Sequence, residues 1–292
     1  MSKNQSQLLK KENPIQQGSS ILQRNGLKES FDPLKYSLSN MKHNKAYYYK
    51  SLNHDDSQEL ILDSMKKRYS WYRKSWLDQP RECIENKVDN ANLIDLGYIP
   101  LCIDIETAAI CDLACPFCFR EYIATPDKVM SVRLAKNIIK QAGELGVPSM
   151  KFNWRGEPLL NPKTPMLIDY AKENGILETI INTNATTLTK KKARSLIECG
   201  LDLMIYSFDG GSKETYEKNR PGRFKNNYFD DIYRNITNFS DMRESMGAKF
   251  PRTKIQMILT EETFDEQESF FNLFDDFVDE VVVNQYTERG GN

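Results

Sequence analysis

Three cysteines lie close together in the first half of the chain. Cys111, Cys115 and Cys118 have the spacing C-x3-C-x2-C inside the segment ETAAICDLACPFCFREY. Thiolates this close can wrap one small metal centre from a single loop. Three protein ligands leave one iron of a cubane cluster open, and a catalytic cluster needs such a position for a small molecule. The spacing therefore predicts a 4Fe-4S cluster bound by these three cysteines.

Zinc, a redox pair and chance are the competing explanations of the three cysteines. Structural zinc needs four ligands, usually in two separated pairs, and neither His43 nor His54 lies in a companion motif. Cys115 and Cys118 alone have the C-x-x-C spacing of a redox pair, but that interpretation leaves Cys111 unexplained. We favour the cluster over these alternatives.

A second polar segment, NWRGEPLLNP, spans residues 153–162. Gly156 allows the backbone to approach a ligand closely, and Pro158 fixes the turn. Glu157 offers an acceptor for an ammonium group. Such a turn alone indicates little, but its place after the cysteine motif favours a binding role.

Two further polar segments follow apolar runs. The first contains Asn182, Thr183 and Asn184, and Asn184 is equally explained as a ligand contact or as a turn residue. The second, SFDGG, contains Ser207 and Asp209 and is followed by Arg220 in the sequence. A guanidinium can donate two parallel hydrogen bonds to a carboxylate, although a surface ion pair with Glu214 or Glu217 is the alternative for Arg220.

The elements that must position these residues alternate regularly after residue 90. We expect buried strands at residues 100–105, 149–154, 178–182, 203–207, 254–259 and 280–284. We expect helices at residues 132–145, 165–174, 190–198, 227–246 and 265–277, with Gly146, Gly175 and Gly200 as their C-terminal caps. The alternation predicts an α/β fold with parallel crossovers, and both a doubly wound sheet and a partial β/α barrel fit it. In either fold the motifs lie beyond the carboxyl ends of the strands.

The N-terminal third differs in composition from the rest. Residues 1–50 carry nine Lys/Arg against three Asp/Glu and show little apolar periodicity, so we expect them to be largely disordered. Apolar residues from Leu60 to Trp76 predict a helix over residues 57–76 that packs on the main domain. We therefore divide the chain into an extension at residues 1–95 and a core at residues 96–292.

Overall composition excludes some classes of protein. No stretch approaches the ~20 apolar residues that span a bilayer. Forty Lys/Arg nearly balance 41 Asp/Glu, so no global field attracts nucleic acid. The N-terminus lacks the apolar core of a secretory signal, and we expect a cytoplasmic protein. We expect Cys83, Cys102 and Cys199 to be small buried side chains.

With Phe117 just before its last cysteine, the cysteine motif resembles the signature of the radical SAM superfamily, and the likeness extends over about residues 100–284. The resemblance implies a partial (β/α)6 TIM-like barrel with a partly disordered, helical N-terminal extension. Gly156, Glu157 and Pro158 resemble the family's GGEP motif, which binds the amino group of S-adenosylmethionine (SAM), with Arg155 replacing the first glycine.

Other segments resemble the branch that contains peptide-modifying and cofactor-maturing enzymes. Ser207, Asp209 and Arg220 match its S-x-D-G segment and later arginine, and the resemblance implies that the serine and the arginine contact SAM. Asn184 matches the frequent T-N-G segment, with alanine in place of glycine. Residues near the expected barrel mouth are further candidates for substrate or adenosine contacts: Gln256, Met257, Asn284, Gln285 and Tyr286.

The resemblance implies cofactors, a reaction and partners. The cofactors are a 4Fe-4S cluster and SAM, whose reductive cleavage gives a 5′-deoxyadenosyl radical that abstracts hydrogen from substrate. A flavodoxin or ferredoxin would supply the electron. A peptide or protein is the first expected substrate, and a carbohydrate or small metabolite the second.

The C-terminal part of the fold and two competing function classes stay open. The chain stops soon after the sixth expected strand, without the SPASM or twitch auxiliary-cluster domain of many relatives, and we expect either a truncated chain or a partner subunit that closes the barrel. A cluster-binding sensor without turnover is the competing class, and a zinc-stabilised nucleic-acid-binding module is a third.

Overall fold

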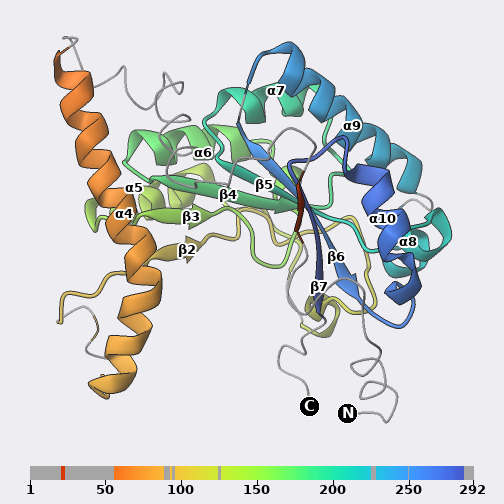
Figure 1. Cartoon of the computed structure of the whole chain (residues 1–292), viewed down its shortest axis with the longest axis horizontal. Coiled ribbons are helices and arrows are strands. Elements are labelled where there is room, and N and C mark those ends of the chain that lie inside the picture. The colour runs from red at the N-terminus through yellow and green to blue at the C-terminus, as the bar shows by residue number, and fades with distance from the viewer. Residues whose placement is uncertain are drawn as a thin grey trace.

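The computed structural model describes residues 21–23, 56–88, 93, 96–123, 126–224, 228–248 and 250–285. Six parallel strands alternate with helices, and a short seventh strand pairs at one edge (Figure 1). The strands are β1 (Ile21–Gln23), β2 (Cys102–Asp104), β3 (Ser149–Lys151), β4 (Glu178–Thr183), β5 (Leu203–Ser207), β6 (Arg252–Leu259) and β7 (Glu280–Gln285). All six strands expected from the sequence are present, with ends shifted by up to three residues.

The helices include all six expected ones. They are α4 (Asp56–Glu85), α5 (Val132–Glu144), α6 (Thr164–Glu173), α7 (Lys190–Glu198), α8 (Lys213–Asn219), α9 (Phe229–Ser245) and α10 (Gln267–Phe274). Gly146, Gly175 and Gly200 have φ angles of +79°, +85° and +81°, which confirms them as left-handed C-terminal caps. The sequence did not predict α8, which begins at the N-cap Ser212, or β1.

Strand order decides between the two expected architectures. The order is β1-β7-β6-β5-β4-β3-β2, so each new parallel strand is added beside the previous one without a reversal. A doubly wound sheet reverses its order at a switch point, which this sheet does not do. The helices that follow the strands form a layer along one side of the sheet (Figure 1). Within the described residues β2 and β7 are not paired, and the partial, open barrel is confirmed.

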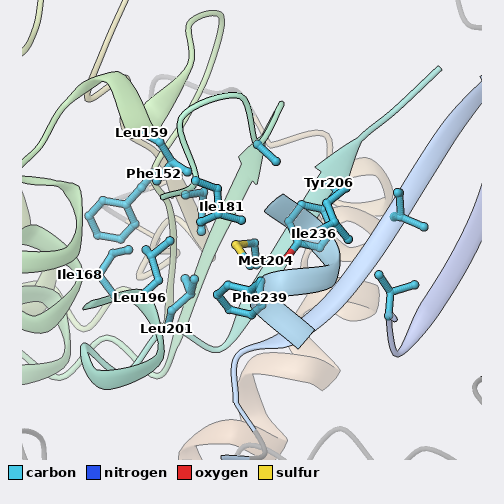
Figure 2. Close-up of a cluster of buried hydrophobic side chains, with 14 of the residues drawn as sticks. Phe152, Leu159, Ile168, Ile181, Leu196, Leu201, Met204, Tyr206, Ile236 and Phe239 are labelled. Carbon is cyan, nitrogen blue, oxygen red and sulfur yellow. The ribbon is translucent and has the colours of Figure 1, made fainter. Parts of the chain in front are cut away.

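The helix-facing side of the sheet carries the core. Ile181 of β4 and Met204 and Tyr206 of β5 are at most 1% exposed, and Figure 2 shows Met204 and Tyr206 beside Ile236 and Phe239 of α9. Burying each such side chain contributes roughly 1.5–3 kcal/mol. Residues on the opposite face of β4, β5 and β6 are only half-buried, and this concave face includes Asn182, Ile180, Ile205, Ser207, Lys254 and Gln256.

Helix α4 packs at the amino ends of the strands, away from the candidate site. Arg68 donates to the carbonyl oxygens of Gly175 and Gly146, at 2.8 and 3.0 Å. The Tyr72 hydroxyl donates to Glu178 Oε2 at 2.7 Å. These contacts confirm that the helix packs on the core, although it runs nine residues beyond the predicted end at residue 76. The boundary at residues 95 and 96 stays a prediction.

Two buried ion pairs fasten helices to strand starts. Lys172 of α6 contacts Asp202, which precedes β5, and the two side chains are 1% and 5% exposed. Arg243 of α9 contacts Asp279, which precedes β7. Each aspartate also accepts a backbone N–H, from Thr179 and from Thr253. These pairs fix the amino ends of the strands, and the carboxyl ends are left for the candidate site.

Some expectations about single residues were wrong. Cys199 is buried as expected, but Cys83 and Cys102 are half-exposed because they lie on α4 and on the concave face of β2. The disorder expected at residues 1–50 lies outside the described residues, apart from β1. No helix in the described part of the chain combines the length and the apolar character needed to cross a bilayer.

Candidate metal and cofactor site

The cysteine loop leaves the carboxyl end of β2, as the motif predicted. Cys115 is 7% exposed, and Cys111 and Cys118 are half-buried. A β-bridge joins Leu113 to Gly222, and the Ala114 N–H donates to the Pro221 carbonyl at 2.9 Å. The loop is therefore fixed against the segment that follows α8.

Asp112 fixes the other side of the cysteine loop. Its Oδ1 accepts from Asn184 Nδ2 at 2.8 Å and its Oδ2 accepts from the Thr186 hydroxyl. Asn184 Nδ2 also lies 3.9 Å from Cys111 Sγ, and Asn184 Oδ1 accepts from the Thr186 N–H at 3.0 Å. Asn184 thus makes the local turn that the sequence left open and also ties the loop after β4 to the first cysteine.

Gly156 is required by a close approach between two loops. A Cβ atom at this position would lie 2.0 Å from the Ala108 carbonyl oxygen and 2.7 Å from that of Ile110. The neighbouring Glu157 N–H donates to the same Ile110 carbonyl at 2.8 Å. The glycine therefore brings Glu157 against the start of the cysteine loop.

The Glu157 carboxylate is held by three hydrogen bonds. Oε1 accepts from the Leu159 N–H and the Thr183 hydroxyl, and Oε2 accepts from the Asn184 N–H at 2.7 Å. The residue is 2% exposed. Burial raises its pKa to about 7, although these donors oppose the rise. Burial lowers the pKa of Lys192, although nearby Glu157 opposes this, and the Lys192 Nζ donates to the Leu159 carbonyl at 2.8 Å. The site thus holds a buried acceptor suited to a cation.

Arg155, the departure from GGEP, has a partner in the cysteine segment. Its backbone N–H and Nε donate to Glu106 Oε1 at 3.0 and 3.2 Å, and its Nη2 donates to Oε2 at 3.0 Å. This fork joins the residue before Gly156 to the strand exit that carries the cysteines.

Arg220 pairs with Asp209, a partner that the sequence did not suggest. Its Nε donates to Asp209 Oδ2 at 2.7 Å, and Asp209 Oδ1 accepts from the Ile258 N–H at 2.7 Å. Burial would lower the pKa of Arg220, but Asp209 and Cys115 outweigh it and raise the pKa. Asp209 therefore fixes a permanent positive charge beside Cys115.

The remaining candidates divide between the two faces of the sheet. Ser207 is half-buried at the carboxyl end of β5, in register with Gln256, and its hydroxyl has no partner among the described residues. Gln256 accepts from Asn284 Nδ2 at 3.3 Å on the same concave face. Met257 is 0% exposed in the helix-side core, so the expected ligand contact there was wrong. The Gln285 side chain and Tyr286 lie outside the described residues.

The cysteines fit a cluster with separate ligand positions. Burial raises the pKa of Cys111 to about 12 and that of Cys115 to about 11, so the free thiols stay protonated until a metal displaces the proton. Where the structure describes side chains, no three His, Cys, Asp or Glu converge on one ion position. A cubane cluster does not need such convergence, because each cysteine binds a different iron. Phe117 is half-buried within the same loop.

Sequence reasoning missed the residues that position the candidates. Asp112, Glu106 and Thr186 carry no recognised motif, and their partners are distant in the sequence. Asp112 follows Cys111 directly, but an acidic residue in a polar loop is usually exposed to solvent. The alternation of strands and helices is the one sequence signal that predicts these segments at the same edge of the sheet.

Comparison with known proteins gives a consistent result. A family model described as "Radical SAM superfamily" matches residues 105–274, more than half of the chain. GTP 3',8-cyclase of Chlorobaculum tepidum is 29% identical over 114 residues, which are 39% of this chain and 34% of that protein. Fe-coproporphyrin III synthase of Methanosarcina barkeri is 29% identical over 145 residues, which are 49% and 35%. The chain thus spans about a third of the length of these curated relatives.

Solved structures show the same fold. Streptococcus suis SuiB bound to S-adenosylmethionine matches with a TM-score of 0.55 and 20% identity, over 90% of this chain and 58% of that one. Native anSMEcpe with bound AdoMet matches with a TM-score of 0.53 and 20% identity, over 66% and 55%.

Proposed function

Because this chain belongs to the radical SAM superfamily, a family of enzymes that use a 4Fe-4S cluster and SAM, we propose that it cleaves SAM to begin radical chemistry on a substrate. We propose Cys111, Cys115 and Cys118 as the cluster ligands. The observation that carries the proposal is the convergence of the cysteine loop, Glu157 and Arg220 at the carboxyl ends of β2 to β5. When bound and reduced, the cluster supplies the electron that divides SAM into methionine and a 5′-deoxyadenosyl radical.

The chain's own residues would hold SAM by complementary charge. Glu157, a buried carboxylate fixed by three donors, would accept an N–H of the methionyl amino group, with Gly156 and Pro158 shaping its turn. A guanidinium has five N–H donors, so Arg220 keeps donors for the methionyl carboxylate beyond those used by Asp209. The unpartnered Ser207 hydroxyl would donate to the same ligand, and Asn184 would hold the cysteine loop in place. These roles place a carboxylate beside the amino group and a guanidinium beside the carboxylate of the methionyl unit.

We place the substrate against the concave face of the sheet. This face combines apolar side chains, such as Ile205, with the polar side chains of Asn182, Gln256 and Lys254. Asn182 Oδ1 is buried there without a hydrogen-bond partner among the described residues. A peptide or protein, which offers both N–H groups and apolar side chains, suits such a wall. SuiB and anSMEcpe have each been solved with a peptide. A carbohydrate or small metabolite is the second candidate, since curated relatives include GTP 3',8-cyclases.

An electron donor would approach the cysteine loop. Phe119, which follows Cys118 directly, and Tyr122 are 49% and 75% exposed and offer an apolar surface beside the half-buried Cys118. A flavodoxin or ferredoxin is the donor that we propose, in the cytoplasm, where the ligand thiols stay reduced. The competing function, a cluster-based sensor, has no use for the carboxylate and guanidinium positioned beside the cluster.

The test is anaerobic production of 5′-deoxyadenosine. The protein is reconstituted with iron and sulfide, reduced with dithionite and mixed with SAM, beside Cys115→Ala and the matched control Cys102→Ala. We expect product from the wild type and from Cys102→Ala, and none from Cys115→Ala. Cluster binding without cleavage would favour the sensor, and zinc in place of iron would refute the proposal.

A further inference from the structure

Tyr216, in the middle of α8, has a buried hydroxyl without a partner in the described part of the chain. The residue is 0% exposed, and its ring stacks on Phe208 with centroids 4.2 Å apart. Phe229 packs against it edge-to-face at 5.8 Å. The hydroxyl forms no hydrogen bond with any residue that the structure describes. A buried hydroxyl left without a partner is unfavourable, so a missing acceptor is expected nearby.

The backbone places Tyr216 beneath the corner formed by Asp209 and Arg220. Arg220 follows Tyr216 by four residues, on the same helix face, and its N–H donates to the Tyr216 carbonyl at 2.7 Å. A Cβ atom on Gly210, the residue after Asp209, would lie 2.5 Å from the Tyr216 nitrogen. Gly210 therefore allows α8 to dock against the end of β5, and the bond from the Ala114 N–H to the Pro221 carbonyl joins the chain after α8 to the residue before Cys115.

The surrounding charges agree with this location. Burial raises the pKa of Tyr216 above its ordinary value, Arg220 opposes the rise, and Cys115 adds to it. The phenol therefore stays protonated at neutral pH and can only act as a donor to an anionic neighbour. A negative group at the Cys115 side of the site would supply the missing acceptor.

We propose that the Tyr216 hydroxyl donates a hydrogen bond to a sulfur of the iron–sulfur cluster at its Cys115 corner. The inference rests on the proposed function, because it requires the cluster. Such a donor stabilises the more negative, reduced state of the cluster and so raises its reduction potential. Tyr216 is then a residue that tunes how easily the cluster accepts its electron.

The chain contains a matched control for this idea. Tyr206 is also buried, and its hydroxyl is likewise unpartnered within the described residues. Its ring packs edge-to-face on Phe239, in the helix-side core, and the charges that act on it are those of Arg243 and Asp279. Replacing either tyrosine by phenylalanine keeps the ring and removes only the hydroxyl.

The experiment compares wild type, Tyr216→Phe and Tyr206→Phe after anaerobic reconstitution. The midpoint potential of each cluster is measured by a redox titration followed by electron paramagnetic resonance, which reports only molecules that carry a cluster. We expect a more negative potential in Tyr216→Phe and the wild-type value in Tyr206→Phe. An unshifted potential in Tyr216→Phe, or an equal shift in both variants, overturns this inference alone. A wild type that binds no iron overturns the proposed function as well.

Discussion

The affinity of the reconstituted protein for SAM should rise with pH as Glu157 loses its proton. Because its pKa is about 7, roughly a tenth of the molecules carry the Glu157 carboxylate at a pH one unit below that value. If the amino group binds only to that form, affinity at pH 6 falls about tenfold from its plateau, a change of ~1.4 kcal/mol. An anionic cluster nearby moves the midpoint upward and leaves the sign unchanged.

Equilibrium binding between about pH 5.5 and about 7.5 tests this dependence, because the amino group of SAM titrates only near pH 8. Glu157→Gln should bind weakly with little change over the same range. In the cofactor-free protein, folding stability should depend on pH with the opposite sign, because Glu157 binds its proton more tightly in the folded protein than in the unfolded chain. Its contribution to the free energy of unfolding therefore falls between about pH 4.5 and about 7. Wild-type affinity for SAM that does not change over this range, or an equal slope in Glu157→Gln, would refute the binding of SAM by ionised Glu157.

Three other changes probe the scaffold. Gly156→Ala should destabilise the protein by about 1–3 kcal/mol and reduce its iron content, because the new methyl group meets the Ala108 carbonyl. Chemical denaturation and iron analysis measure both effects, and wild-type values for both would contradict the prediction. Lys172→Met leaves buried Asp202 without its cation, and urea denaturation should show a loss of about 3–5 kcal/mol; a loss below about 1 kcal/mol would contradict the pairing. Arg155→Gly restores the glycine of GGEP but removes the fork to the cysteine segment, and calorimetry should show weaker SAM binding; unchanged affinity would mean that the fork has no positioning role.

Periodicity and glycine caps predicted most of the fold. Buried strands such as β5 and amphipathic helices such as α7 carry their own pattern, and each cap glycine marks a helix end. Helix α8 was missed because its seven residues are mainly polar and charged, and only Tyr216 and Asn219 are buried. Pro80 and the exposed residues around it concealed the last turns of α4. The choice between barrel and doubly wound sheet depended on strand order, which no local pattern encodes.

The site could be predicted only as far as its motifs reached. Types, spacing and the family resemblance made Cys111, Glu157 and Arg220 candidates, because each matches a requirement of the proposed chemistry. Their partners, Asp112 for the cysteine loop and Asp209 for Arg220, depend on tertiary contacts. The same holds for Ala185, which stands where glycine is usual in the T-N-G segment. Its φ of +58° shows that the backbone needs the left-handed conformation that glycine adopts without strain.

In the proposed function, three cysteines leave one iron of the cluster open for SAM. Mössbauer spectroscopy of protein reconstituted with iron-57, with and without SAM, tests it most directly. With three protein ligands, about one iron in four should change its signal when SAM is added, and Glu157→Gln should reduce that change. Four irons that remain equivalent after SAM addition would contradict an open iron that binds SAM.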